Sequence, residues 1–142
     1  MYNHILLPID LSESSSWEKA LPTALYLCKN ADAKLHLLTV LPDFGMTIVG
    51  QYFPKGYEEE MAAKALESLH KFVREHVPED IHVQHIIGEG SVYEIILKTA
   101  DDINADIIVM GSHRPELKDY LLGPNAARVV RHANCSVMVV RD

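Results

Sequence analysis

The sequence has few cysteines, an excess of acidic over basic residues and no long apolar segment, and each feature excludes a class of protein. Its two cysteines, Cys28 and Cys135, lie far apart in the 142 residues, so we expect no functional disulfide and treat each thiol as a small buried hydrophobe. Lys and Arg number 13 against 20 Asp and Glu. The net charge of −7 disfavours a protein that coats nucleic acid or an anionic membrane surface.

Apolar runs are all far shorter than the roughly 18 to 20 residues that a membrane-spanning helix needs. Residues 1–10 contain neither Lys nor Arg, so we expect no export signal, no membrane insertion and a cytoplasmic protein. A hydrophobic content of 48% with 23% charged residues is ordinary for a folded domain. Together with the chain length, it predicts one domain over residues 1–142.

Five short apolar segments alternate with segments of helical periodicity. We expect strands at residues 3–9, 33–40, 81–87, 106–110 and 136–140, and helices after residue 16 and at residues 57–77, 91–104 and 124–132. This order predicts a mostly parallel sheet with right-handed crossovers, because parallel strands need a helix-length return. The hydroxyls of Ser12 to Ser16 suit a cap for the first helix, and Pro22 predicts a kink or a break in its first turn.

Apolar side chains at three- and four-residue spacing predict the buried face of each helix. In the second helix these are Met61, Ala65, Leu66, Leu69, Phe72 and Val73, and in the third they are Val92, Ile95, Ile96 and Ala100.

Three segments of this arrangement end strands at one edge of the sheet: residues 8–10, 39–41 and 110–114. Ligands bind at such an edge where the strand order reverses. Gly111 would allow a ligand to approach the backbone, His113 and Arg114 supply cationic or hydrogen-bonding side chains, and Gly123 precedes a helix start that favours phosphate. The alternative is an ordinary strand-to-loop turn and helix N-terminus, because neither a P-loop nor a G-x-G-x-x-G motif is present.

Four blocks carry a resemblance to a known family: HILLPIDLSESS, LHLLTVLP, GEGSVYEIILKTADDINADIIVMGSHRP and YLLGPNAARVVRHANCSVMVVRD. Along nearly its whole length the chain resembles the universal stress protein family. The resemblance implies a Rossmann-like α/β fold of the adenine nucleotide alpha hydrolase-like type. Its five-stranded parallel sheet has the order 3-2-1-4-5 and helices on both faces. ATP then lies over the strand ends, and we expect a divalent cation, Mg or Mn, to bridge its phosphates.

The resemblance also assigns roles to twelve residues. Those bordering the adenine are Pro8, Ile9, Asp10 and Val40; those along the ribose and phosphates are Met110, Gly111, His113 and Arg114; those capping the phosphates are Gly123, Pro124, Asn125 and Ala126.

The chain departs from the family pattern G-x2-G-x9-G-[ST] at three points. Arg114 stands where the second glycine usually falls, and the interval from Gly111 to Gly123 is about one residue shorter than the pattern. Pro124 takes the Ser/Thr position, which removes a hydroxyl and a backbone N–H. Each lost hydrogen bond is worth roughly 0.5 to 1.5 kcal/mol, so we expect nucleotide affinity to be weakened rather than abolished.

Partners follow from the last strand and from the form of the glycine segment. Residues 136–140 would leave an uncovered apolar edge, which the resemblance covers with a second copy in a homodimer, with tetramers forming by further contacts. The S-H-R-P…Y-L-L-G form is similar to a transporter-associated branch of the family. The sequence therefore predicts an ATP-binding stress or regulatory protein, with a transport system as one candidate for the partner it regulates.

Two other functions remain open at this stage. One is slow ATP hydrolysis with His113 or Asp10 acting on water, although no evident general base stands beside a γ-phosphate. The other is a nucleotide-independent dimeric interaction module. A protein-only zinc site is disfavoured because His82 and His85 would face opposite sides of a strand, and a Ser-His-Asp hydrolase lacks its nucleophile elbow.

Overall fold

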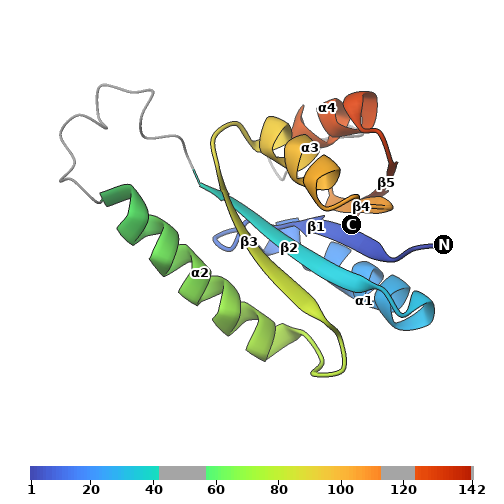
Figure 1. The fold of residues 1–142 in the computed structure, drawn as a ribbon, viewed down its shortest axis with the longest axis horizontal. Coiled ribbons are helices and arrows are strands. Elements are labelled where there is room, and N and C mark those ends of the chain that lie inside the picture. Colours follow the sequence, from blue (N-terminus) through green and yellow to red (C-terminus); the bar gives the residue numbers. More distant parts are fainter. Residues whose placement is uncertain (42–56, 113–123, 142) are drawn as a thin grey trace.

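The structure is a computed structural model that describes residues 1–41, 57–112 and 124–141. Strands and helices alternate along these ranges (Figure 1). They are β1 (His4–Pro8), the short 3-10 helix η1 (Ser14–Ser16), α1 (Ala20–Ala31), β2 (Lys34–Leu41), α2 (Tyr57–His76), β3 (Val83–Glu89), α3 (Val92–Asp102), β4 (Ile107–Gly111), α4 (Pro124–His132) and β5 (Ser136–Val140).

The strands form one parallel sheet in the order β3-β2-β1-β4-β5, which confirms the predicted topology. From β1 the chain builds β2 and β3 on one side, and it then crosses to add β4 and β5 on the other. The strand order therefore reverses between β1 and β4. In open α/β sheets this is the position where ligands bind, beyond the carboxyl ends of the strands.

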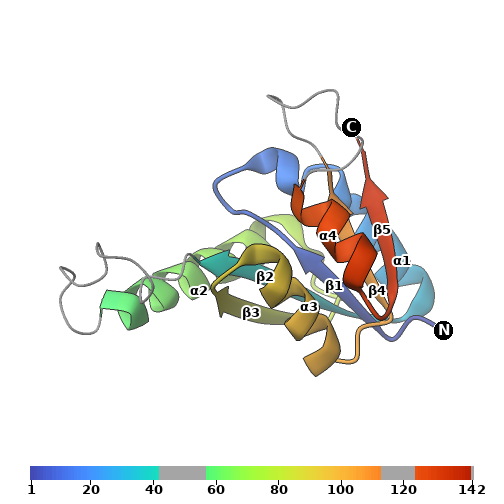
Figure 2. The same ribbon diagram turned by 90° about the horizontal axis from the view of Figure 1, so that it is seen from above.

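Helices cover both faces of the sheet (Figure 2). The alternation of the strand side chains divides the core into two clusters. Helices α1 and α2 pack on the face that carries Ile5, Leu7 and Leu37. Helices α3 and α4 pack on the face that carries Leu6 and Ile108. The central strands β1 and β4 are buried on both faces, which explains why residues 5–7 and 107–110 are continuously apolar rather than alternating.

The first helix begins later than the sequence suggests. Ser14–Ser16 form η1, α1 starts at Ala20, and the residue before α1 is Lys19, which makes no side-chain capping bond. The expectation that a serine of this run caps the helix is therefore wrong. The hydroxyl of Ser16 instead lies 2.7 Å from the carbonyl of Glu13 within the preceding turn. Pro22 falls in the first turn of α1, where its missing N–H breaks no helical bond.

Two of the predicted helix faces are partly wrong. Leu66 is 38% exposed, whereas Leu69 is fully buried and Phe72 is 6% exposed, so the buried face of α2 is narrower than expected. Val92 is 40% exposed because it is the first residue of α3, whereas Ile96 and Ala100 are buried. Helical spacing alone does not show where a helix leaves the surface it covers.

A single carboxylate joins the amino-terminal ends of β1 and β4. Asp106 Oδ2 accepts hydrogen bonds from the backbone N–H groups of Asn3 at 2.7 Å and His4 at 2.8 Å. These two bonds lower the pKa of Asp106. Asp106 therefore clamps two central strands, β1 and β4, together.

None of the helices in the described ranges is long and apolar enough to cross a membrane. Within those ranges both cysteines are free thiols; Cys28 is buried, as predicted, and Cys135 is half-buried.

Candidate functional site

The carboxyl ends of β1 and β4 separate where the strand order reverses. β1 pairs with β2 over five residues, from His4 to Pro8, but with β4 only at Ile5 and Leu6. Pro8 has no backbone N–H with which to extend the ladder, so β1 and β4 end their pairing before either strand ends. The separation begins beside the predicted residues Pro8 and Met110.

Asp10 follows directly on β1 and is held by the turn that leads into η1. Its Oδ1 atom accepts hydrogen bonds from Ser12 N at 3.0 Å and from Ser12 Oγ at 2.7 Å. Its backbone N–H donates to Ser16 Oγ at 2.9 Å. The Asp10 side chain is exposed, and no described residue donates to its Oδ2 atom. An oriented carboxylate with a free acceptor therefore stands at the end of β1.

The backbone of Ile9 is fully engaged in holding β1 to β2. Its N–H donates to the carbonyl of Leu38 at 2.8 Å, and its carbonyl accepts from Thr39 Oγ1 at 3.3 Å. The Ile9 side chain is 5% exposed and packs in the cluster beneath α1. Ile9 therefore positions its neighbours, Pro8 and Asp10, and its own side chain lies on the opposite face from Val40.

Gly111 has a structural role that the sequence does not reveal. A Cβ built on Gly111 would lie 2.9 Å from the carbonyl oxygen of Ser16 and 3.3 Å from that of Ser15. Both atoms belong to the backbone of η1, which packs against the end of β4. The missing side chain thus admits η1, whereas the sequence suggested that it admits a ligand. η1 closes the α1 side of the β1–β4 separation.

The opposite side of the separation has an apolar floor. Met110 is 6% exposed, Ala126 is 3% exposed, and Val40 is half-buried, and all three belong to the core cluster beneath α3 and α4. Residues from β2, β4 and α4, which are distant in sequence, therefore meet on one face. Ala126 can reach a ligand only through its backbone, because its side chain is part of the core.

The first turn of α4 points unpaired amides toward the carboxyl ends of the strands. α4 begins at Pro124, so the N–H groups of Asn125 and Ala126 lie in the first turn, where an α-helix provides no intrahelical acceptor. The helix dipole adds roughly half a positive elementary charge at this end. The arrangement favours an anion at the start of α4.

His113, Arg114 and Gly123 lie outside the described residues, so their predicted roles stay predictions. A cation that the sequence interpretation missed lies in α4: the Arg128 guanidinium stacks over the ring of Tyr93 at 4.9 Å. Tyr93 is in the first turn of α3. The sequence could have indicated this cation, because Arg128 lies one helical turn after Pro124, at the predicted helix start.

These features fit an adenine nucleotide. A flat apolar base is compatible with the floor formed by Val40 and Met110, the free acceptor of Asp10 suits an exocyclic amine, and the first turn of α4 suits a phosphate. In the described ranges no group of three or more His, Cys, Asp or Glu side chains could hold a metal ion.

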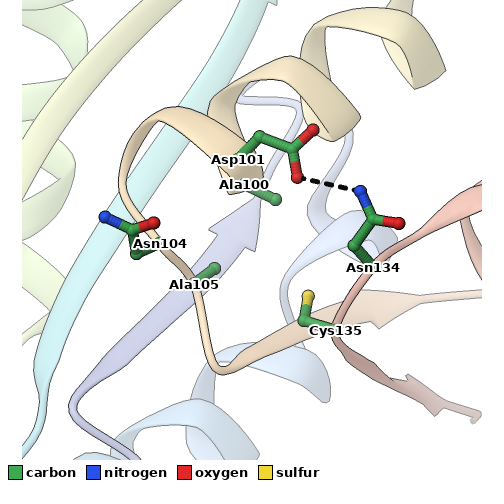
Figure 3. Close-up of a pocket in the computed structure, with 6 residues that line it drawn as sticks. All are labelled: Ala100, Asp101, Asn104, Ala105, Asn134 and Cys135. Atoms are coloured by element: carbon green, nitrogen blue, oxygen red, sulfur yellow. Dashed lines mark hydrogen bonds between the residues drawn. The ribbon is translucent and has the colours of Figure 1, made fainter.

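A second, shallow pocket of about 220 Å³ lies at the other end of the sheet, between the loops that precede β4 and β5 (Figure 3). Asn134 Nδ2 donates to Asp101 Oδ1 at 3.3 Å across it, and Cys135 forms part of its wall. Burial, and then the charges of Asp101 and Asp106, raise the pKa of the Cys135 thiol. The thiol is therefore held protonated and is a poor nucleophile.

Comparison with known proteins gives consistent relatives over the whole chain. The family model described as "Universal stress protein family" matches residues 1–141. Universal stress protein G of Escherichia coli O157:H7 is 33% identical over 143 residues, which cover 99% of this chain and all of that protein. The structure of protein MJ0577, from Methanocaldococcus jannaschii, is 28% identical with a TM-score of 0.75 and covers 100% of this chain and 97% of its own.

More distant structures share the fold. Universal stress protein UspA from Lactobacillus plantarum is 23% identical with a TM-score of 0.76, covering 99% of this chain and 98% of its own. A universal stress protein described in complex with cAMP is 20% identical with a TM-score of 0.62, covering 99% and 97%.

Proposed function

The chain belongs to the universal stress protein family, and from that premise we propose that it is a cytoplasmic ATP-binding regulatory protein. The observation that carries the proposal is the early end of the β1–β4 pairing at the point where the strand order reverses. A relative of the same fold, described in complex with cAMP, supports an adenine nucleotide as the ligand class.

Each part of the proposed site has a physical role. The carboxylate of Asp10 accepts a hydrogen bond from the adenine amino group, while Pro8 and Val40 border the base. The amides of Asn125 and Ala126 donate to phosphate oxygens. Met110 forms part of the apolar surface under the ligand, and Gly111 lets η1 pack against the end of β4. We assign the ribose and phosphate contacts outside the described residues to His113, Arg114 and Gly123.

ATP supplies a polyanion that can carry its own divalent cation, Mg or Mn, and this charge decides how the protein must bind it. With a net charge of −7, the protein as a whole repels a triphosphate. Local donors therefore provide the attraction, namely the first turn of α4 and nearby cations such as Arg128. Pro124 lowers the number of those donors, so we expect a modest affinity.

Binding and regulation, rather than rapid turnover, are the proposed activity. A nucleotide held over β1, β2 and β4 would be sensed through the segments that follow β2 and β4 by a partner protein. A transport system is one such candidate, on the resemblance to the transporter-associated branch.

We also propose a homodimer through the outer edge of β5. β5 is the last strand of the sheet, and no described strand pairs with its outer edge. Met138 on β5 is 36% exposed and Val130 on the preceding α4 is 45% exposed. A second copy that covers this edge would remove unpaired backbone groups and bury both side chains. Tetramers would need further contacts.

Isothermal titration calorimetry with ATP, ADP and AMP tests the nucleotide proposal. We expect saturable heat with ATP, and a loss of affinity of roughly tenfold or more in Asp10→Ala, from the loss of one hydrogen bond to a charged group. Asp80→Ala, at an exposed turn after α2, is the matched control and should bind like the unsubstituted protein. No heat with any nucleotide would favour the nucleotide-independent module, and rapid ADP release from ATP would identify an ATPase instead.

Light scattering after size exclusion tests the dimer. Met138→Glu should give monomers, whereas Tyr26→Glu on α1, where the side chain is 68% exposed, should leave the mass unchanged. A Met138→Glu protein that keeps its mass would contradict the β5 interface.

A further inference from the structure

Four of the chain's eight histidines form two pairs on opposite faces of β2 and β3. On the face covered by α3, His4 Nδ1 lies 3.0 Å from His36 Nε2, and His36 Nδ1 lies 2.5 Å from Gln84 Oε1. On the face covered by α2, the rings of His70 and His85 stack with centroids 3.9 Å apart. One pair therefore holds β3 to β2 and β1, and the other holds β3 to α2.

In the first pair, burial disfavours a charged His36. Because Gln84 Oε1 can only accept, His36 Nδ1 must donate to it, and His36 Nε2 is then the acceptor for a proton on His4. A second proton on His36 would be donated to His4 Nδ1, in the other tautomer of the His4 ring, and would leave the positive charge on the buried ring. His36 is 3% exposed, and burial, followed by the charges of His4 and Lys34, lowers its pKa, against an upward effect of the Gln84 bond.

A carboxylate lies on the His4 side of the first pair. Asp106, from the start of β4, holds the backbone of His4, and its carboxylate interacts with the His4 charge. In the described part of the chain no carboxylate acts on His36. Among the described residues, a positive charge on the buried His36 therefore has no carboxylate to balance it.

The second pair disfavours charge in a similar way. His85 Nε2 is buried with no hydrogen-bond partner among the described residues, and burial, followed by the His70 charge, lowers the pKa of His85. Glu67 and Arg74 flank His70 at the i−3 and i+4 positions of α2, one of each sign. Over the described residues, the ion pair that involves a histidine is that of His76 with Glu75, outside both pairs.

We propose that the two pairs make β3 and α2 an acid-sensitive element, which opens below neutral pH while β1, β4 and β5 stay paired. β3 is an edge strand that pairs with β2 alone among the described strands. Its lateral contacts to β2 and to α2 each include one histidine, His36 and His85, whose charged form is disfavoured by burial in the closed state. Strands β4 and β5, on the side of the sheet opposite β3, contain no histidine.

The direction of the effect follows from proton linkage. A histidine whose pKa is lower in the closed state stabilises that state fully above its open-state pKa of about 6.5. The stabilisation declines as the pH falls below that value and is gone once the pH has passed the lowered pKa. Between the two values, opening becomes roughly tenfold more favourable per pH unit for each proton taken up.

Hydrogen exchange at pH 7.5, 6.5 and 5.5, corrected for the intrinsic chemistry of exchange, measures this opening. We expect peptides from β3 and α2 to lose protection by roughly tenfold or more between pH 6.5 and 5.5, while β4 and β5 peptides keep theirs. His36→Gln and His85→Gln should each reduce the pH dependence, and the double variant should remove it. His82→Gln is the control, because this exposed ring belongs to neither pair.

A second readout uses the unsubstituted protein alone, in case His36→Gln does not fold. In proton NMR titrations the rings of His36 and His85 should charge at a pH below the ordinary histidine pKa of about 6.5. The proposal is overturned if both rings charge at the ordinary value, if protection in β3 is independent of pH, if all strands lose protection at once, or if a folded double variant keeps the pH dependence.

Discussion

Gly111→Ala separates the structural account of this glycine from the one that the sequence suggested. The added Cβ would meet the carbonyl oxygens of Ser16 at 2.9 Å and of Ser15 at 3.3 Å. Both are backbone atoms within η1, so the contact cannot be relieved by a side-chain rotation. Either η1 or the end of β4 must shift.

The expected cost follows from overpacking. Inserting one methyl group against a fixed backbone typically costs about 1 to 3 kcal/mol. For a domain of this size each kcal/mol lowers the melting temperature by roughly 3 to 4 °C, so the variant should melt roughly 3 to 12 °C lower. Because Ser16 also holds the backbone N–H of Asp10, the shift should weaken nucleotide binding as well.

Thermal and urea unfolding of the ligand-free protein provide the assay. Ser112→Ala is the matched control on the next residue, and we expect a change within about 0.5 kcal/mol. If Gly111→Ala has the unfolding free energy of the parent protein and loses only nucleotide binding, then the glycine admits a ligand and the assignment to η1 is wrong.

Three further outcomes follow from the packing and the ionisation of the described residues. In urea unfolding at pH 7, Asp106→Ala should lower the free energy of unfolding by about 1 kcal/mol, after allowance for solvent exposure. Because the pKa of Asp106 is lowered in the folded protein, this difference from the parent should shrink as the pH falls below about 4. Leu69→Ala should lower the free energy of unfolding by about 2 to 5 kcal/mol and Leu66→Ala by less than about 1 kcal/mol. Unfolding measurements that show the opposite order would mean that α2 is rotated about its axis. Burial raises the pKa of the Cys28 thiol to about 11, so a thiol reagent at pH 8 should modify Cys135 first and Cys28 only as fast as the protein opens; equal rates would contradict the burial.

The sheet topology could be predicted because each strand segment is short, apolar and followed by a helical pattern. The bounds of α4 and β5 match the prediction, and the others differ by a few residues at their ends. The start of α1 was missed because a serine run is equally suited to a helix cap and to a tight turn, and the choice depends on which carbonyls the hydroxyls meet. In the structure the Ser16 hydroxyl donates to the carbonyls of Asp10 and Glu13, so this serine stabilises a turn and does not cap the helix.

The meeting of the strand ends could be predicted from the sequence, whereas the contacts around them could not. The carboxyl ends of β1, β2 and β4 meet as expected, because parallel topology dictates it. The orientation of Ile9, the contact of Gly111 with η1 and the burial of Ala126 depend on packing between segments distant in sequence. The two histidine pairs were also invisible, because the partners in each pair are separated by 32 and 15 positions, respectively.

The central claim is that an adenine nucleotide binds where β1 and β4 separate, and amide chemical shifts recorded during an ATP titration test it most directly. The account predicts that the largest shifts fall on Asp10, Val40, Gly111 and Asn125, and that they saturate together. The amide signal of Asn134, a residue that lines the pocket at the opposite end of the sheet, should not shift. Shifts that cluster around Asn134, or no saturable shifts at all, would contradict the account.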